Sequence, residues 1–121
     1  MAGQYAEAIS NFKTVVQLNK AALAAEARYE IASCWFRLNK LTESEKAAFE
    51  TINKSGSYDY WVTKAYILLG DIYFRQKDYF NAKATYQSIV DNTLDAELKA
   101  EAQTKLNQVT EEEGKSSKLG N

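Results

Sequence analysis

The sequence feature that most constrains the fold is an alternation of bulky and very small residues within positions 69–86. Tyr73 and Tyr86 are bulky, whereas Gly70 and Ala82 are small. Two helix axes can approach to about 8–10 Å only where a large side chain on one helix meets a small residue on the other. The spacing therefore predicts two helices that pack antiparallel through one tight turn.

The same pattern occurs earlier in the chain. Residues 31–49 repeat it in a weaker form, and Trp35 stands 38 positions before Tyr73, with a Phe-Arg pair following in both copies. Near the N-terminus, the turn and second helix of a third copy are matched by Gly3, Tyr5, Ala8 and Phe12. The chain is therefore predicted to contain one strong repeat, one degraded repeat and one half repeat.

In the strong repeat the pattern consists of Leu69-Gly70, Tyr73, Tyr79, Ala82 and Tyr86. This order resembles the tetratricopeptide repeat, a helix-turn-helix unit of about 34 residues. The resemblance implies an all-α fold in which antiparallel helical hairpins stack as a short right-handed α-solenoid of about six helices. Residues 1–110 then form one helical repeat domain. Its predicted parts are a half repeat at 3–20, repeats at 25–54 and 63–93, and a capping helix at 95–110.

The breaks between helices follow from local sequence. Lys54-Ser55-Gly56-Ser57 is the clearest break, and Gly56 is well placed to cap the preceding helix in the left-handed conformation. Thr42, with Glu45 three residues later, is expected to cap the start of that same helix, which is predicted at about 41–53. Residues 111–121 carry too little apolar surface to offset the entropy of ordering them, so we predict a disordered tail.

The composition argues against catalysis and metal binding. The chain has no histidine, which is the usual general base and the commonest neutral metal ligand. The single cysteine, Cys34, lies on an apolar helix and is expected to be a buried, inert thiol. Carboxylate pairs such as Glu97 and Glu101 show the mixed-charge pattern of a solvated helix face. We therefore expect no catalytic residue, no metal site, no cofactor and no enzymatic activity.

Charge and hydropathy narrow the classes of partner. The chain has 15 basic and 16 acidic residues, a net charge of −1, and no basic patch suited to nucleic acid. It also lacks the run of about 20 apolar residues that a membrane span requires. We therefore expect a protein or peptide partner, with no nucleic acid and no direct membrane insertion.

Tetratricopeptide proteins generally hold a segment of another protein in a concave groove formed by the first helices of successive repeats, and the resemblance implies such a groove here. Phe36-Arg37 and Phe74-Arg75 form two equivalent aromatic-plus-cation pairs, and both residue types are enriched at binding hot spots. The alternative, in which the two Phe side chains pack against neighbouring helices and the two Arg side chains are solvated, stays open. The predicted groove residues are Tyr29, Ser33, Phe36, Arg37, Lys64, Ile67, Asp71, Phe74 and Arg75.

The resemblance implies a non-catalytic protein–protein interaction scaffold. Chaperone-binding members of the family carry a Lys/Asn clamp for a C-terminal carboxylate. The corresponding positions here hold Tyr29, Ser33, Ile67 and Asp71, so this clamp is missing. The alternative function is that of a regulatory or structural helical domain within a larger multidomain protein.

The chain begins inside a repeat, which indicates a piece of a longer repeat protein. Residues 60–73, after a Lys-Ser-Gly loop, are similar to the C-terminal repeats of large tetratricopeptide proteins of the bacterial cell envelope. That likeness implies the periplasm or cell envelope, and without it we expect the cytoplasm. Because the first helix lacks its partner, we expect a homo-oligomer formed through an uncovered apolar side that carries Tyr5, Ile9, Phe12 and Val16.

Overall fold

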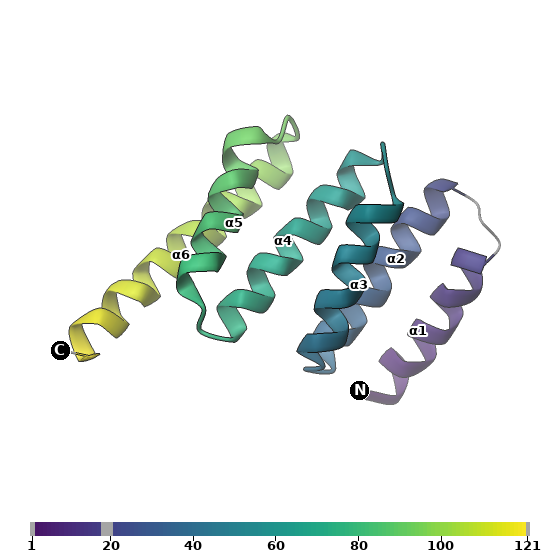
Figure 1. Cartoon of the computed structure of the whole chain (residues 1–121), viewed down its shortest axis with the longest axis horizontal. Coiled ribbons are helices and arrows are strands. Elements are labelled where there is room, and N and C mark those ends of the chain that lie inside the picture. The colour runs from purple at the N-terminus through teal and green to yellow at the C-terminus, as the bar shows by residue number, and fades with distance from the viewer. Residues whose placement is uncertain (1, 18–20, 121) are drawn as a thin grey trace.

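The computed structural model describes residues 2–17 and 21–120, and within them it contains six helices and no strand. The helices are α1 (Ala2–Gln17), α2 (Ala21–Arg37), α3 (Leu41–Lys54), α4 (Asp59–Arg75), α5 (Tyr79–Asn92) and α6 (Ala96–Gly120). They follow one another across the molecule, with α1 at one end and α5 and α6 at the other (Figure 1). The predicted all-α solenoid of helical hairpins is confirmed. Residues 18–20 of the predicted half repeat lie outside the described part.

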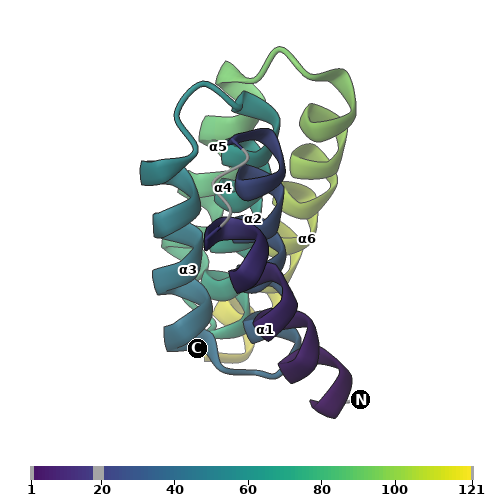
Figure 2. The same cartoon turned by 90° about the vertical axis from the view of Figure 1, so that its right-hand side faces the viewer.

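The helices form two layers. In one layer α4 contacts both α2 and α6, whereas α3 and α5 of the other layer do not touch within the described residues. Figure 2 views the stack from one end, with α3 and α6 on opposite sides. The layer of α2, α4 and α6 carries the face on which the groove is expected.

None of the helices that the structure describes is both long and apolar enough to cross a bilayer.

The α4–α5 hairpin packs as the alternation of residue sizes predicts. Tyr86 of α5 is 0% exposed, and its ring lies against the backbone of Gly70 in α4. A Cβ atom at position 70 would stand 2.4 Å from the Cε1 atom of Tyr86, which is closer than real Cβ contacts allow. Ala82 is also fully buried. The close approach of the two helices therefore depends on the absence of a side chain at Gly70.

The α2–α3 hairpin replaces this contact with a smaller one. Ala32 and Ala48 occupy the positions equivalent to Gly70 and Tyr86, and both are fully buried. Ser44 takes the small position of α3, and its buried hydroxyl donates a hydrogen bond to the Ala32 carbonyl at 2.8 Å. The buried hydroxyl is therefore satisfied rather than left to cost stability. The degraded repeat keeps the helix contact with a pair of small residues and one hydrogen bond.

The N-terminal helix is covered more completely than its sequence suggests. Ile9 is buried in a cluster with Ile31 and Cys34, and the other three residues of the expected uncovered side are half-buried against that cluster. The expectation that Ile9 has an uncovered side is therefore wrong. The reason is that α2, which begins the next repeat, packs against the apolar stripe of α1. Self-association through α1 stays a prediction.

The turns use the left-handed backbone conformation at three positions. Gly56 has φ +52°, as predicted for a helix cap, while Asn39 and Lys77 have φ 59° and 62° at equivalent places in the two tight turns. Thr42 does not cap α3, because that helix already begins at Leu41 and its N-terminal flanking residue makes no side-chain cap. The predicted Thr42 cap is therefore wrong.

A side-chain cap is found instead at the start of α5. Asp78 accepts a hydrogen bond from the backbone N–H of Asn81 at 3.2 Å. This cap satisfies one of the backbone donors that every helix start leaves unpaired.

Replacing Gly56 by alanine is expected to lower the free energy of unfolding by about 1 kcal/mol. The left-handed conformation at this position costs a residue with a Cβ atom about 1–2 kcal/mol. Urea unfolding followed by circular dichroism measures the loss, with Ser57→Ala at the neighbouring exposed position as the control. Equal stability of the two variants would show that the turn relaxes without cost.

The predicted disordered tail, residues 111–121, is wrong for the described residues, because α6 continues through most of it as helix. Glu113 of this segment pairs with Lys83 of α5 at 2.7 Å. Lys115 also lies 3.5 Å from Glu111, one helical turn earlier. The prediction counted only apolar surface, whereas charged pairs one turn apart and across helices also favour the helical state.

Candidate functional site

A groove crosses the face formed by α2, α4 and α6. It is an open cavity of about 460 Å³. All of the predicted groove residues except Phe74 line it, namely Tyr29, Ser33, Phe36 and Arg37 from α2 and Lys64, Ile67, Asp71 and Arg75 from α4. Helical periodicity within α2 and α4 is thus enough to place these side chains on one surface.

Phe74 lies elsewhere. Its ring centroid is 6.0 Å from that of Tyr79, and its side chain packs against the buried cluster of α4, α5 and α6. It lines a separate hollow together with Gln108 of α6. The alternative that this side chain packs against neighbouring helices therefore holds for Phe74, and the groove prediction is wrong for this residue.

The aromatic–cation contact in the groove forms between helices. The guanidinium of Arg75 in α4 lies 4.3 Å from the centroid of the Phe36 ring in α2. Its Nη1 atom also donates a hydrogen bond to the side-chain oxygen of Asn39 at 3.1 Å. The guanidinium over the Phe36 ring therefore comes from the next repeat, because residues i and i+1 on a helix point in different directions.

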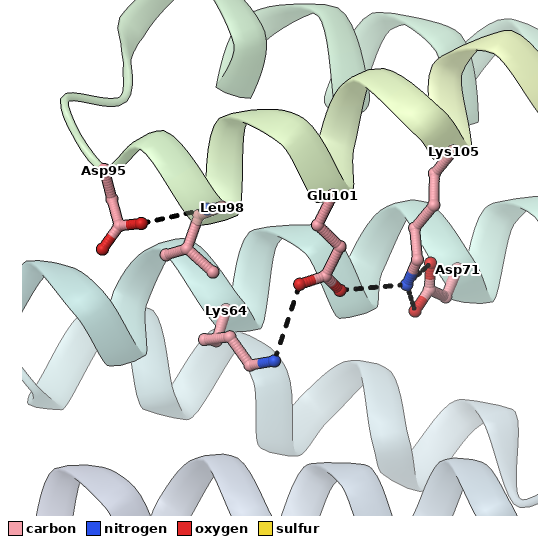
Figure 3. Close-up of polar contacts among 6 residues, drawn as sticks. All are labelled: Lys64, Asp71, Asp95, Leu98, Glu101 and Lys105. Carbon is pink, nitrogen blue, oxygen red and sulfur yellow. Dashed lines mark hydrogen bonds and ion pairs between the residues drawn. The ribbon is translucent and has the colours of Figure 1, made fainter.

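The centre of the groove holds a network of ion pairs between α4 and α6 (Figure 3). Lys105 Nζ lies 2.8 Å from Asp71 Oδ2 and 3.3 Å from Glu101 Oε2. Glu101 reaches back to Lys64 Nζ at 3.8 Å. Asp71 also accepts a hydrogen bond from the hydroxyl of the buried Tyr86. The charges of this network compensate one another, and they tie α6 to the groove face of α4.

Sequence reasoning missed the contribution of α6 to the groove. Glu101 was assigned to a solvated surface, whereas Glu101 and Lys105 both line the cavity. A signal was present, because these residues stand 34 positions after Ile67 and Asp71, which is the ordinary length of the repeat. The last helix therefore also occupies the place of a first helix in a further repeat.

Two tyrosines of this region resist ionisation. Burial raises the pKa of Tyr86 above its ordinary value of 10.0, and the neighbouring Asp71 carboxylate adds to the effect. Burial likewise raises the pKa of Tyr29, with smaller contributions from Glu30, Asp71 and Glu101. Both phenols therefore keep their protons in the folded state at pH values where the unfolded chain loses them.

Stability is expected to fall as the pH rises above about 10. There the unfolded state binds fewer protons than the folded state, so the free energy of unfolding decreases with pH. Denaturant titrations at several pH values between 8 and 11 measure how steeply the free energy of unfolding falls with pH, and this range brackets the ordinary tyrosine pKa. The Tyr86→Phe variant should show a shallower decline than Tyr66→Phe, which alters an exposed ring. The same slope in both variants would contradict the assignment to Tyr86.

The described residues offer little for metal or thiol chemistry. In residues 2–17 and 21–120, no three Asp, Glu, Cys or His side chains are grouped so that they could hold a metal ion. Cys34 is buried, and burial raises the pKa of its thiol. A raised thiol pKa lowers the fraction of reactive thiolate. The predicted burial of Cys34 is confirmed.

Comparisons with known proteins identify repeats over most of the chain. Two family models, each described as tetratricopeptide repeat, match residues 2–60 and residues 64–92. No curated protein and no solved structure matches the chain. The matched residues include α1 to α3, α5 and all of α4 except residues 61–63, whereas α6, which supplies Glu101 and Lys105 to the groove, lies beyond both matches.

Proposed function

The chain belongs to the tetratricopeptide repeat family, whose repeats generally mediate protein–protein interaction, and from this we propose that its groove holds a segment of another protein. The observation that carries the proposal is the convergence of α2, α4 and α6 on one cavity that contains both aromatic and arginine side chains. Tyrosine and arginine are enriched among the few hot-spot residues that dominate the binding energy at protein interfaces. The chain would then act as a scaffold without catalysis.

Another hollow of similar size supports binding less well. A cavity of about 500 Å³ lies between α4 and α5, and its lining is uncharged, with apolar and aromatic residues such as Ile89 and Tyr66 beside polar ones such as Thr85. It contains no charged side chain that could orient a ligand. The groove combines directed hydrogen-bond donors with the Phe36 ring, so it is the better candidate for specific recognition.

Selection from a library of short random peptides tests the proposal. The peptides are displayed as internal segments, so that no free C-terminus is offered, and are selected on the purified chain. We expect enriched peptides whose binding is abolished by Ser33→Trp, because the added indole fills the groove. The control is Lys99→Trp, which adds the same side chain at an exposed position of α6.

Circular dichroism establishes that both variants remain helical. A failure to enrich any peptide, or enriched peptides that bind the Ser33→Trp variant as well as the original chain, would refute the proposed function. Either result would favour the alternative of a regulatory or structural helical domain.

A further inference from the structure

The charges that line the groove are unevenly compensated. Asp71 and Glu101 pair with Lys64 and Lys105 at its centre. Arg37 and Arg75 line the same cavity, and in the part of the chain that the structure describes neither forms an ion pair with a carboxylate. The chain as a whole has a net charge of −1. The side chains that line the groove therefore carry four positive and two negative charges, and Glu30 beside Lys64 and Arg37 offsets part of this positive excess.

Arg75 is held in place for recognition of an anion. Its guanidinium is stacked on the Phe36 ring and bound through Nη1 to the Asn39 side chain. A guanidinium has five N–H donors, so donors remain for a carboxylate, which it can bind through two parallel hydrogen bonds. Because two contacts already restrain the side chain, binding loses less conformational entropy than it would with a free arginine.

The geometry points to an acidic protein segment as the occupant of the groove, with an Asp or Glu side chain of that segment bound by Arg75 and Arg37. This inference rests on the proposed function and specifies its partner. The positive cavity attracts an anionic chain, and the groove extends over three helices, so an extended segment can pass through it. The Phe36 ring offers an apolar surface beside the bound carboxylate.

The composition of the groove-binding peptides tests the inference. We expect them to be enriched in Asp and Glu, and their affinity to fall as salt concentration rises. Arg75→Ala should weaken binding roughly 10- to 100-fold, the range expected when a hydrogen bond to a charged group is lost. Arg75→Lys should give an intermediate loss, because it keeps the charge but not the planar fork.

Two further variants separate recognition from folding. Asn39→Gly removes the group that restrains Arg75, keeps the charge and suits the left-handed backbone at position 39, so we expect weaker binding with an unchanged fold. Lys99→Ala removes a positive charge from an exposed position outside the groove, and we expect no more than about a twofold change.

Two outcomes would overturn the acidic partner while leaving the proposed function intact. These are groove-bound peptides that are neutral or basic, and acidic peptides that bind the Arg37→Ala and Arg75→Ala variants unchanged. The absence of any groove-bound peptide would overturn the proposed function itself.

Discussion

Replacing Tyr86 by alanine is expected to lower the free energy of unfolding by about 3–5 kcal/mol, the range for removing a large buried aromatic side chain. Tyr86 is 0% exposed, and it packs against Gly70 in the contact that brings α4 and α5 together. Its hydroxyl also donates a hydrogen bond to Asp71 in the floor of the groove. The substitution would leave a cavity in the hairpin and remove a contact that orients the ion-pair network.

Urea unfolding of Tyr86→Ala and of Phe80→Ala measures this effect against a matched control. Phe80 is an aromatic residue of the same helix but is 78% exposed, so its removal should change stability by no more than about 0.5 kcal/mol. Tyr86→Phe removes only the hydroxyl and should cost about 1.5–3 kcal/mol, the range for a hydrogen bond to a charged group. Similar losses for Tyr86→Ala and Phe80→Ala would mean that the hairpin does not depend on this ring.

Replacing Gly70 by alanine is expected to destabilise the chain by about 1–3 kcal/mol through overpacking. The new Cβ atom would stand 2.4 Å from Cε1 of Tyr86 and 2.8 Å from two further atoms of that ring. The ring is fully buried and hydrogen-bonded to Asp71, so it cannot move away freely. At an unconstrained helical position the same substitution stabilises by about 0.8–1 kcal/mol, so a loss here identifies steric conflict.

Gly114→Ala is the matched control, because a Cβ atom at position 114 of α6 has nothing within 4 Å. We expect opposite signs for the two variants in thermal or urea unfolding. The cost of Gly70→Ala should also shrink by more than about 0.5 kcal/mol when Tyr86→Leu is already present, since the two sites are in contact. A stabilising Gly70→Ala variant would contradict the predicted close packing of the Tyr86 ring against Gly70.

Much of the fold could be predicted because the signals are local. Gly70 and Ala82 were assigned as small partners of large residues from their spacing alone, and both lie in the tight α4–α5 contact. The break at Gly56 also followed from the residue type, since glycine adopts a positive φ at little cost. The end of α6 was missed in part because the ion pair that joins Glu113 to Lys83 connects two helices, and in part because the local pairing of Glu111 with Lys115 was not counted.

The residues of the candidate site could likewise be predicted only in part. Residue spacing within α2 and α4 placed Tyr29, Ser33 and Ile67 on the groove surface, where they lie. It placed Phe74 there as well, although this side chain turns towards Tyr79. A single step along a helix rotates a side chain by about 100°, so a position near the edge of a face can fall on either side of it.

The amino-acid sequence by itself determined the helices, their pairing into hairpins and the family, because helix periodicity and the match of large with small residues act over one or two turns of chain. Only the tertiary structure decided which charges meet across repeats. Arg75 lies on Phe36, and Lys105 lies against Asp71, because the rotation and stagger of α2, α4 and α6 bring together residues 34 to 39 positions apart. That rotation is set by the packing of all three helices at once, and no single segment of the sequence specifies it.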